Sequence, residues 1–134
     1  MADNFAVILE LNENADAKQY TVAAGTSISK GDLLKLSGDN TVSQSAANSD
    51  VYGGVAAADK DGTDSSTTLG VHVPGALNKF DMKCGSAGVT LGALVSLSAG
   101  NLIKDATSAE VITGDVIGKA QEAGSAAEVI AILS

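Results

Sequence analysis

The residues that could support chemistry are few in this sequence and stand far apart. His72 is its single histidine and Cys84 its single cysteine. Zinc sites and cysteine–histidine nucleophile pairs bring several such side chains together. His72 alternates with Val71 and Val73 along a β-prone run, so we expect it at a surface or an interface, on the opposite face from the valines. We expect Cys84 to be a small buried apolar residue. The sequence therefore predicts no catalytic residue, no metal and no cofactor, and a protein that is not an enzyme.

The acidic segment Asp59–Asp64 spaces its carboxylates around a glycine, as a calcium-binding loop does. An EF-hand loop needs further acceptors and a glutamate at its last position, and this segment supplies neither. We interpret it as a solvated loop. The pair Gly53-Gly54 is not followed by the Gly-Lys-Ser/Thr of a phosphate-binding loop.

The net charge of −8 and the pI near 4.3 exclude whole classes of partner. Nothing here could neutralise a row of phosphates, so we expect no nucleic-acid binding, and an anionic membrane surface is equally disfavoured. No apolar run reaches the roughly 18 residues of a membrane span, and Met1–Phe5 lacks the basic start of a signal peptide. A single cysteine fits a protein made in a reducing cytoplasm.

Short β-prone runs separated by Gly, Ser, Asn and Asp dominate the chain, a pattern typical of a sandwich or barrel. We predict an all-β fold, a small β-barrel, β-tulip-like or sandwich domain, with one helical turn over Thr107 to Thr113. The alanine-rich tail ends in a β-branched run, Glu128 to Leu133, which we interpret as a closing strand. The expected strands cover residues 5–11, 19–23, 27–36, 41–44, 51–57, 68–73, 80–84, 89–97, 101–104, 116–120 and 129–133.

An internal repeat is the most informative pattern. The ten residues Ile28–Ser37 align without a gap on Val89–Ser98, with four identities, and each copy continues into a Gly/Asn turn and then an apolar pair before a glycine. Gly31 and Gly92 stand where a strand starts after a turn, a place that suits a positive φ or a close backbone approach. We interpret the pattern as a duplicated strand–turn–strand unit, which indicates architecture and not function.

The domain organisation follows from these features. Residues 1–18 form an N-terminal arm or a first strand with a polar connector, and residues 19–134 form a single β domain whose repeat units cover about 25–57 and 86–121. Aromatic residues make up only 3% of the chain, so the core is built from small side chains. Thin cores are often completed by oligomerisation or by docking on a larger body.

The N-terminal segment from Ala2 to Leu11 is the candidate contact with a neighbouring protein. It is an apolar strand that could add to the edge of another sheet. The alternative is an ordinary first strand within the chain's own barrel, and the sequence leaves both open. The candidate contact residues are Phe5, Val7, Ile8, Leu9 and Leu11.

Three stretches together resemble the small capsid decoration (cement) proteins of tailed bacteriophages. They are Gly25–Leu36 with its Lys-Gly-Asp, Asp50–Ala56 with its Gly-Val-Ala, and Gly70–Lys79 with its Gly-Val. The resemblance covers roughly residues 20 to 120. The family pattern often reads Gly-Val-Phe followed by an apolar-Pro-Lys segment, and this chain departs from it with Val71-His-Val-Pro-Gly-Ala.

The resemblance implies a β-barrel or β-tulip domain on the outside of a virion, made in the host cytoplasm. Such a protein stabilises the phage head by bridging subunits of the major capsid protein, usually as a homotrimer at local threefold axes, and has no catalytic residues. The alternative function is a virion surface or fibre-associated module that binds a host glycan or receptor. Glycan sites commonly use exposed aromatic rings, and this chain has four Phe and Tyr residues.

Overall fold

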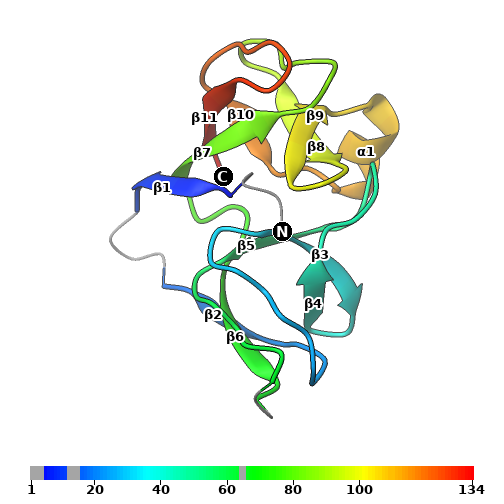
Figure 1. Cartoon of the computed structure of the whole chain (residues 1–134). Helices are drawn as coiled ribbons and strands as arrows, with labels where there is room; N and C mark the ends of the chain where they lie inside the picture. Colours follow the sequence, from blue (N-terminus) through cyan, green and yellow to red (C-terminus); the bar gives the residue numbers. More distant parts are fainter. Residues whose placement is uncertain (1–4, 12–15, 64–65) are drawn as a thin grey trace.

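The computed structural model describes residues 5–11, 16–63 and 66–134, and these are organised almost entirely in β-strands (Figure 1). The expected all-β class is confirmed. The first half holds β1 (Val7–Glu10), β2 (Lys18–Thr21), β3 (Leu33–Gly38), β4 (Thr41–Gln44), β5 (Tyr52–Ala56) and β6 (Thr68–His72). The second half holds β7 (Lys79–Cys84), β8 (Leu94–Ser98), β9 (Leu102–Asp105), α1 (Ser108–Thr113), β10 (Gly118–Ala120) and β11 (Val129–Leu133).

Two barrels of the same topology make up the molecule. In the first barrel the strands pair in the closed order β2-β4-β3-β5-β6. In the second, β7 pairs with β11, β11 with β10, β10 with β8, β8 with β9, and β9 with β7 again, so the pairing also runs round a closed circuit. Each circuit contains one parallel pair, β2–β4 and β7–β9. Figure 1 shows the first barrel below and the second above.

The register of the hairpins shows that the repeat is structural as well as sequential. Leu36 lies opposite Val42 in the first barrel, and Leu97 lies opposite Ile103 at the equivalent positions of the second. The sequence repeat units of 25–57 and 86–121 each contain three strands of a barrel. The structural repeat adds β2 and β6 to the first unit and β7 and β11 to the second, so each full unit has five strands.

The glycines of the repeat lie where the backbone requires them. The predicted strand over 27–36 is shorter than expected: residues 27–32 form a turn, bridged to Lys60 through Ile28, and β3 begins only at Leu33. Gly31 in this turn has φ +90° and its repeat partner Gly92 has φ +77°. Both values lie in the left-handed region that a side chain disfavours.

The hydrophobic core has two parts, and the barrels share one of them. Seven buried residues fill the first barrel: Val22, Ile28, Leu34, Val42, Ala56, Leu69 and Val71. A larger cluster fills the second barrel and takes in Leu33, Tyr52 and Val55 from the first. The barrels therefore bury apolar surface against each other and form one packed body.

Buried hydrogen bonds reinforce this joint. The Asn101 side chain, in the β8–β9 turn, donates to Asp32 Oδ1 at 2.9 Å and accepts from Leu33 N at 3.2 Å. Ser49 N donates to Leu97 O at 3.0 Å. Asp32 is fully buried and Asn101 is 3% exposed. The turn of the second barrel is thus fixed on the start of β3.

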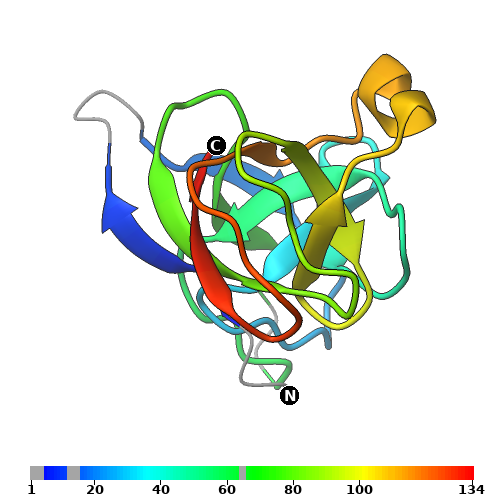
Figure 2. The ribbon, with the colours of Figure 1, turned by 90° about the horizontal axis from the view of Figure 1, so that it is seen from above.

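The connection from β9 to β10 carries α1, which stands away from the barrels in Figure 2. The predicted helical turn is confirmed, and so is the closing strand, which is β11. Thr107 caps the helix, and the Glu110 side chain bonds back to Thr107 N, which completes a capping box. The Thr-x-x-Glu spacing is the sequence signal for this helix start.

Candidate functional site

The candidate contact strand belongs to the chain's own fold. β1 pairs antiparallel with the first half of β7, with Ile8 opposite Phe80 and Glu10 opposite Lys79. The second half of β7 pairs with β9. Of the two alternatives left by the sequence, the structure shows a strand of the chain's own sheet. Residues 1–4 of the predicted arm and 12–15 of its connector lie outside the described residues.

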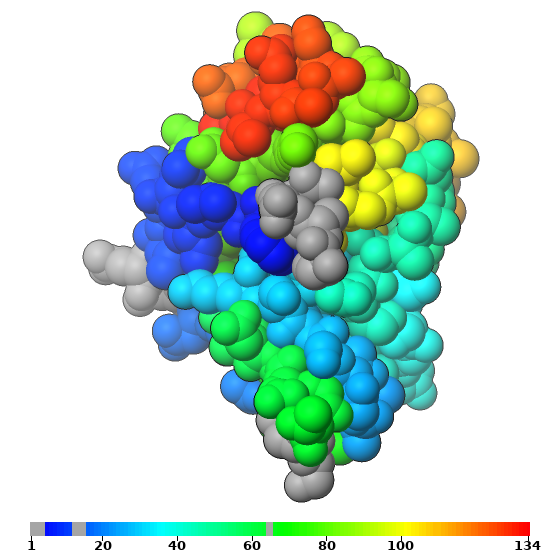
Figure 3. Space-filling view, in the orientation of Figure 1, coloured from blue at the N-terminus to red at the C-terminus, as the bar shows by residue number. Residues whose placement is uncertain are grey.

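The two faces of β1 differ in burial, as strand alternation requires. Ala6 is buried and Ile8 packs partly against the shared core. On the outer face Val7, Leu9 and Leu11 are 56%, 45% and 53% exposed. The remaining candidate, Phe5, is half-buried. Figure 3 shows this segment, coloured blue, at the surface between the two barrels.

The outer edge of β1 pairs with no strand among the described residues, since β1 ends the sheet order β1-β7-β11-β10-β8-β9. An edge strand presents unpaired N–H and C=O groups to which another chain can add. The segment from Val7 to Leu11 therefore combines exposed apolar side chains with the free edge of β1.

A groove of about 340 Å³ runs beside β1. Ala6 N donates to Gly31 O at 2.8 Å, so the N-terminal segment lies directly against the turn that starts β3. The groove is lined on one side by the N-terminal segment and on the other by the first barrel, through Phe5, Ala6, Val7, Ile8, Lys30, Gly31, Val55 and Ala56. Seven of these eight side chains are uncharged, so the groove suits an apolar partner.

The close approach at Gly31 makes a testable prediction. A Cβ at Gly31 would lie 2.7 Å from Ala6 O and 3.0 Å from the Phe5 Cβ, whereas a Cβ at Gly92 would meet only the Lys119 Cε, at 4.0 Å. Both alanine variants face the same positive-φ cost, of about 1 kcal/mol. We expect Gly31→Ala to lower the free energy of unfolding by about 2 kcal/mol more than Gly92→Ala does, because only the new methyl group at position 31 must displace the backbone of Ala6. Urea denaturation of both variants measures the difference, and equal losses would contradict the close approach.

The two isolated reactive side chains are both placed in packing roles. His72 faces away from the buried Val71, as its alternation predicts, and its ring lies 5.9 Å from that of Phe80, in the joint between the barrels. Burial, and after it the charge of Lys30, lower the pKa of His72. Cys84 is 1% exposed, and burial raises the pKa of its thiol. A protonated buried thiol is a poor nucleophile.

Two carboxylates of the acidic loop accept hydrogen bonds from backbone amides, one of them in the turn before β3. Asp59 Oδ1 accepts from Lys30 N at 2.7 Å, and Asp61 Oδ1 accepts from Thr63 N at 2.8 Å. Asp64 lies outside the described residues. Among those that are described, no group of three or more His, Cys, Asp and Glu side chains is arranged to hold a metal ion. No helix in the same residues is long and apolar enough to cross a membrane.

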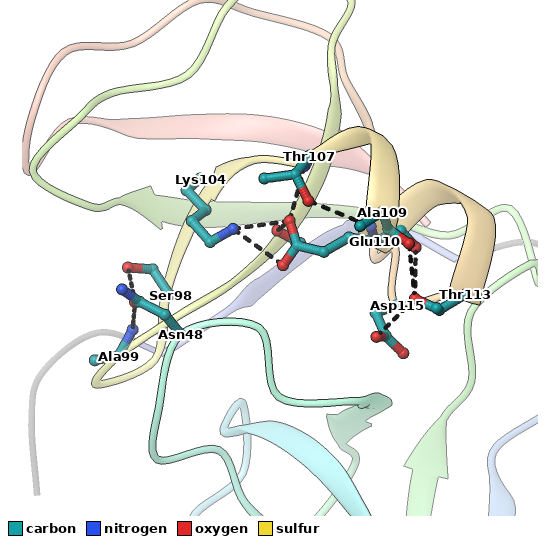
Figure 4. A network of polar contacts seen from close by, with 10 residues as sticks. Asn48, Ser98, Ala99, Lys104, Thr107, Ala109, Glu110, Thr113 and Asp115 are labelled. Atoms are coloured by element: carbon teal, nitrogen blue, oxygen red, sulfur yellow. Dashed lines mark hydrogen bonds and ion pairs between the residues drawn. The ribbon is translucent and has the colours of Figure 1, made fainter.

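A polar network beneath α1 was not singled out in the sequence. Glu110 is 5% exposed, and its carboxylate accepts from Lys104 Nζ at 2.8 and 3.0 Å, Thr107 N at 2.8 Å and Ser96 Oγ at 3.1 Å (Figure 4). Figure 4 also shows Asn48 bonded to Ser98 and Ala99. These hydrogen bonds hold α1 on strands β8 and β9, and they hold the β4–β5 connection on the β8–β9 turn.

Known structures include one with a similar architecture. The N base of the head fibre protein gp8.5 of bacteriophage phi29 aligns over 87% of this chain and 92% of that one, with a TM-score of 0.54. The fold is shared. The sequences are 16% identical, so the similarity is one of fold alone. No protein-family model matches the sequence, and no curated protein matches it.

Proposed function

We propose that this protein is a structural component of a phage virion, which decorates the outside of the head and stabilises it by bridging subunits of the major capsid protein. The observation that carries the proposal is the likeness in fold, over 87% of this chain, to the N base of a phage head fibre. The sequence resemblance to decoration proteins leads to the same proposal independently.

The surface supports a binding role over a chemical one. Of the groups that could have formed an active site, Cys84 is buried and His72 is half-buried against Phe80, and many of the exposed apolar positions lie on strands, β1 among them. We assign the capsid contact to the outer face of β1, and we propose a homotrimer as the assembled form. The glycan-binding alternative is weakened, because Tyr52 and Phe80 are 4% and 1% exposed and Phe5 and Tyr20 are half-buried, so none of these four rings is a fully exposed platform for stacking.

Copurification tests the proposal directly. Capsid shells assembled from the major capsid protein of the encoding phage, without this chain, are mixed with it and sedimented. We expect saturable binding at a fixed copy number per shell. Absence of the protein from the pelleted shells, and from purified virions, would refute the proposal.

The contact face has its own prediction. We expect the double substitution Val7→Asp with Leu9→Asp to weaken shell binding at least about tenfold, because it places two charges on a surface that must lose its water on docking. Point variants are preferable to deletion of the strand, since β1 also pairs with β7. The matched control is Ile112→Asp, at an 85% exposed residue of α1. Equal loss in both variants, or none, would contradict the assignment to β1.

A further inference from the structure

The joint between the two barrels is formed by two different surfaces, one from each barrel. Because the barrels are duplicates, each also carries the other kind of surface, and that second surface is exposed. The joint is heterologous: the start of β3 in the first barrel packs on the β8–β9 turn of the second. Equivalent surfaces do not meet each other. Each barrel carries both kinds of surface, so the second barrel has its own β3-like start and the first barrel its own turn. A heterologous joint can be repeated between copies until a ring closes.

Burial of the repeated residues shows which surfaces are unused. Leu33 in the first barrel and Leu94 in the second occupy equivalent positions of the repeat, yet Leu33 is 1% exposed and Leu94 is 41% exposed. Leu36 and Leu97 are also equivalent, but here the residue of the second barrel is the buried one: Leu97 is 0% exposed and Leu36 is 40% exposed. In both pairs the residue at the joint is buried and its repeat partner is exposed to solvent.

The polar residues of the joint follow the same rule. Asn101 is 3% exposed and fixes the start of β3, whereas its repeat partner Asn40 is exposed. The two asparagines share a left-handed backbone, with φ 66° and 48°, so the turns have the same conformation. At the equivalent glycines the cover comes from the N-terminal segment and not from the second barrel: Gly31 meets Ala6 and Phe5, whereas Gly92 is open.

We propose that copies of this chain associate head to tail, by packing the unused β3-like start of one second barrel against the unused turn of the next copy's first barrel. We call these surfaces the Leu94 face and the Leu36 end. The Leu94 face consists of Leu91, Gly92, Leu94 and Lys119; the Leu36 end consists of Leu36, Asp39, Asn40 and Val51. The proposal deepens the proposed function, because it names the contact through which a homotrimer forms.

The two surfaces are complementary in apolar area and in charge. Leu91 and Leu94 are 66% and 41% exposed on the first, and Leu36 and Val51 are 40% and 46% exposed on the second. Val51 O accepts from Leu36 N at 2.9 Å, so these two residues form one patch. Lys119 brings a positive charge to the Leu94 face and Asp39 a negative charge to the Leu36 end. The internal joint has Val55 and Gly100 at those repeat positions, so the charges are specific to the outer surfaces.

The contact between copies also lacks a polar bond that the internal joint has. The partner of Asp32 in the repeat is Ala93, which cannot form the carboxylate–amide bond made by Asp32 to Asn101. The joint between copies therefore lacks a buried polar anchor and is weaker than the internal one. Association that depends on protein concentration is the expected behaviour.

Mixing two disabled variants tests the head-to-tail geometry. Leu36→Asp destroys one surface and Leu94→Asp the other. We expect sedimentation velocity to show the wild-type protein shifting from monomer to trimer as its concentration rises, and self-association at least about tenfold weaker in each variant. An equimolar mixture should form a one-to-one dimer, because the variants retain one intact half of the joint each. Leu77→Asp, at a 62% exposed leucine outside both surfaces, serves as the control and should assemble as the wild type does.

Three results would overturn the proposal: a wild-type protein that stays monomeric up to its solubility limit, single variants that assemble normally, or a mixture that remains monomeric. Circular dichroism verifies that the variants fold. The outcome is separable from that of the proposed function. A chain that binds shells without self-association would refute only the head-to-tail contact, and a self-associating chain absent from shells and virions would refute only the capsid role.

Discussion

Replacing Asp32 with alanine is expected to lower the free energy of unfolding by about 4 kcal/mol, because one buried and two partly buried donors lose their acceptor at once. The carboxylate is fully buried and accepts from Ser29 N at 2.9 Å, Gln44 Nε2 at 2.7 Å and Asn101 Nδ2 at 2.9 Å. Such a loss is a large share of the stability of a small domain. Urea denaturation at neutral pH measures it.

The Asp32 carboxylate links the turn before β3 to Asn101 of the second barrel, so its removal should also weaken the contact between the two barrels. A double-mutant cycle with Asn101→Gly isolates that part, since glycine tolerates the φ of 66° at this position. We expect a coupling energy above about 1 kcal/mol. The control is Asp105→Asn, at an exposed carboxylate that accepts from Thr90 N and Oγ1. If Asp105→Asn lowered the free energy of unfolding as much as Asp32→Ala does, the effect at Asp32 would not arise from its burial at the joint.

Acid is expected to destabilise the protein through Glu110. Burial raises the pKa of this carboxyl, but hydrogen bonds from Lys104, Ser49, Thr107 N and Ser96 outweigh it and lower the pKa from 4.5 to about 2. A group with a depressed folded pKa stabilises the protein above its unfolded pKa and loses that effect as the pH falls through the folded value. The shift corresponds to up to about 3 kcal/mol at neutral pH.

The corresponding variant is Glu110→Gln, which retains the shape and removes the charge. We expect it to be less stable than the wild type at pH 7 and to lose less stability than the wild type between pH 5 and pH 2, since Asp50 and Asp61, whose pKa values are also lowered, titrate in both proteins. Denaturant titrations at several pH values give both curves. The matched control is Glu128→Gln, an exposed residue that accepts from Ser125 N. Parallel curves for the wild type and Glu110→Gln would show that Glu110 is not the group responsible.

Much of the fold could be predicted from local pattern. The strand runs, the helical turn after Thr107 and the β11 strand all follow from alternation, turn residues and β-branched side chains. The repeat was visible because Gly31 and Gly92 hold the same turn conformation, and identical turns select identical residues. The strand pairs β2–β4 and β7–β9 could not be predicted, since they are parallel contacts between segments distant in the sequence.

The candidate site was predictable only as a list of residues. The apolar run from Phe5 to Leu11 predicts a strand, but whether that strand pairs with its own chain depends on which edge is free after the barrels close. Glu110 could have been found from the Thr-x-x-Glu spacing of its capping box. The burial of Asp32 could not be predicted from its neighbours in the sequence. The one related observation is that the equivalent position of the second repeat unit holds an apolar residue, Ala93.

The sequence by itself determined the class of this protein: an acidic, aromatic-poor, duplicated β fold with its few reactive side chains scattered. Only the tertiary structure decided what the two copies of the repeat do. Leu33 and Leu94 are indistinguishable in the sequence, and so are Leu36 and Leu97, yet each pair has one buried and one exposed member. The physical reason is that the burial of a side chain depends on what packs against it in the folded protein, and not on its residue type alone. One heterologous joint between two equivalent barrels must cover one member of each pair and leave the other in solvent.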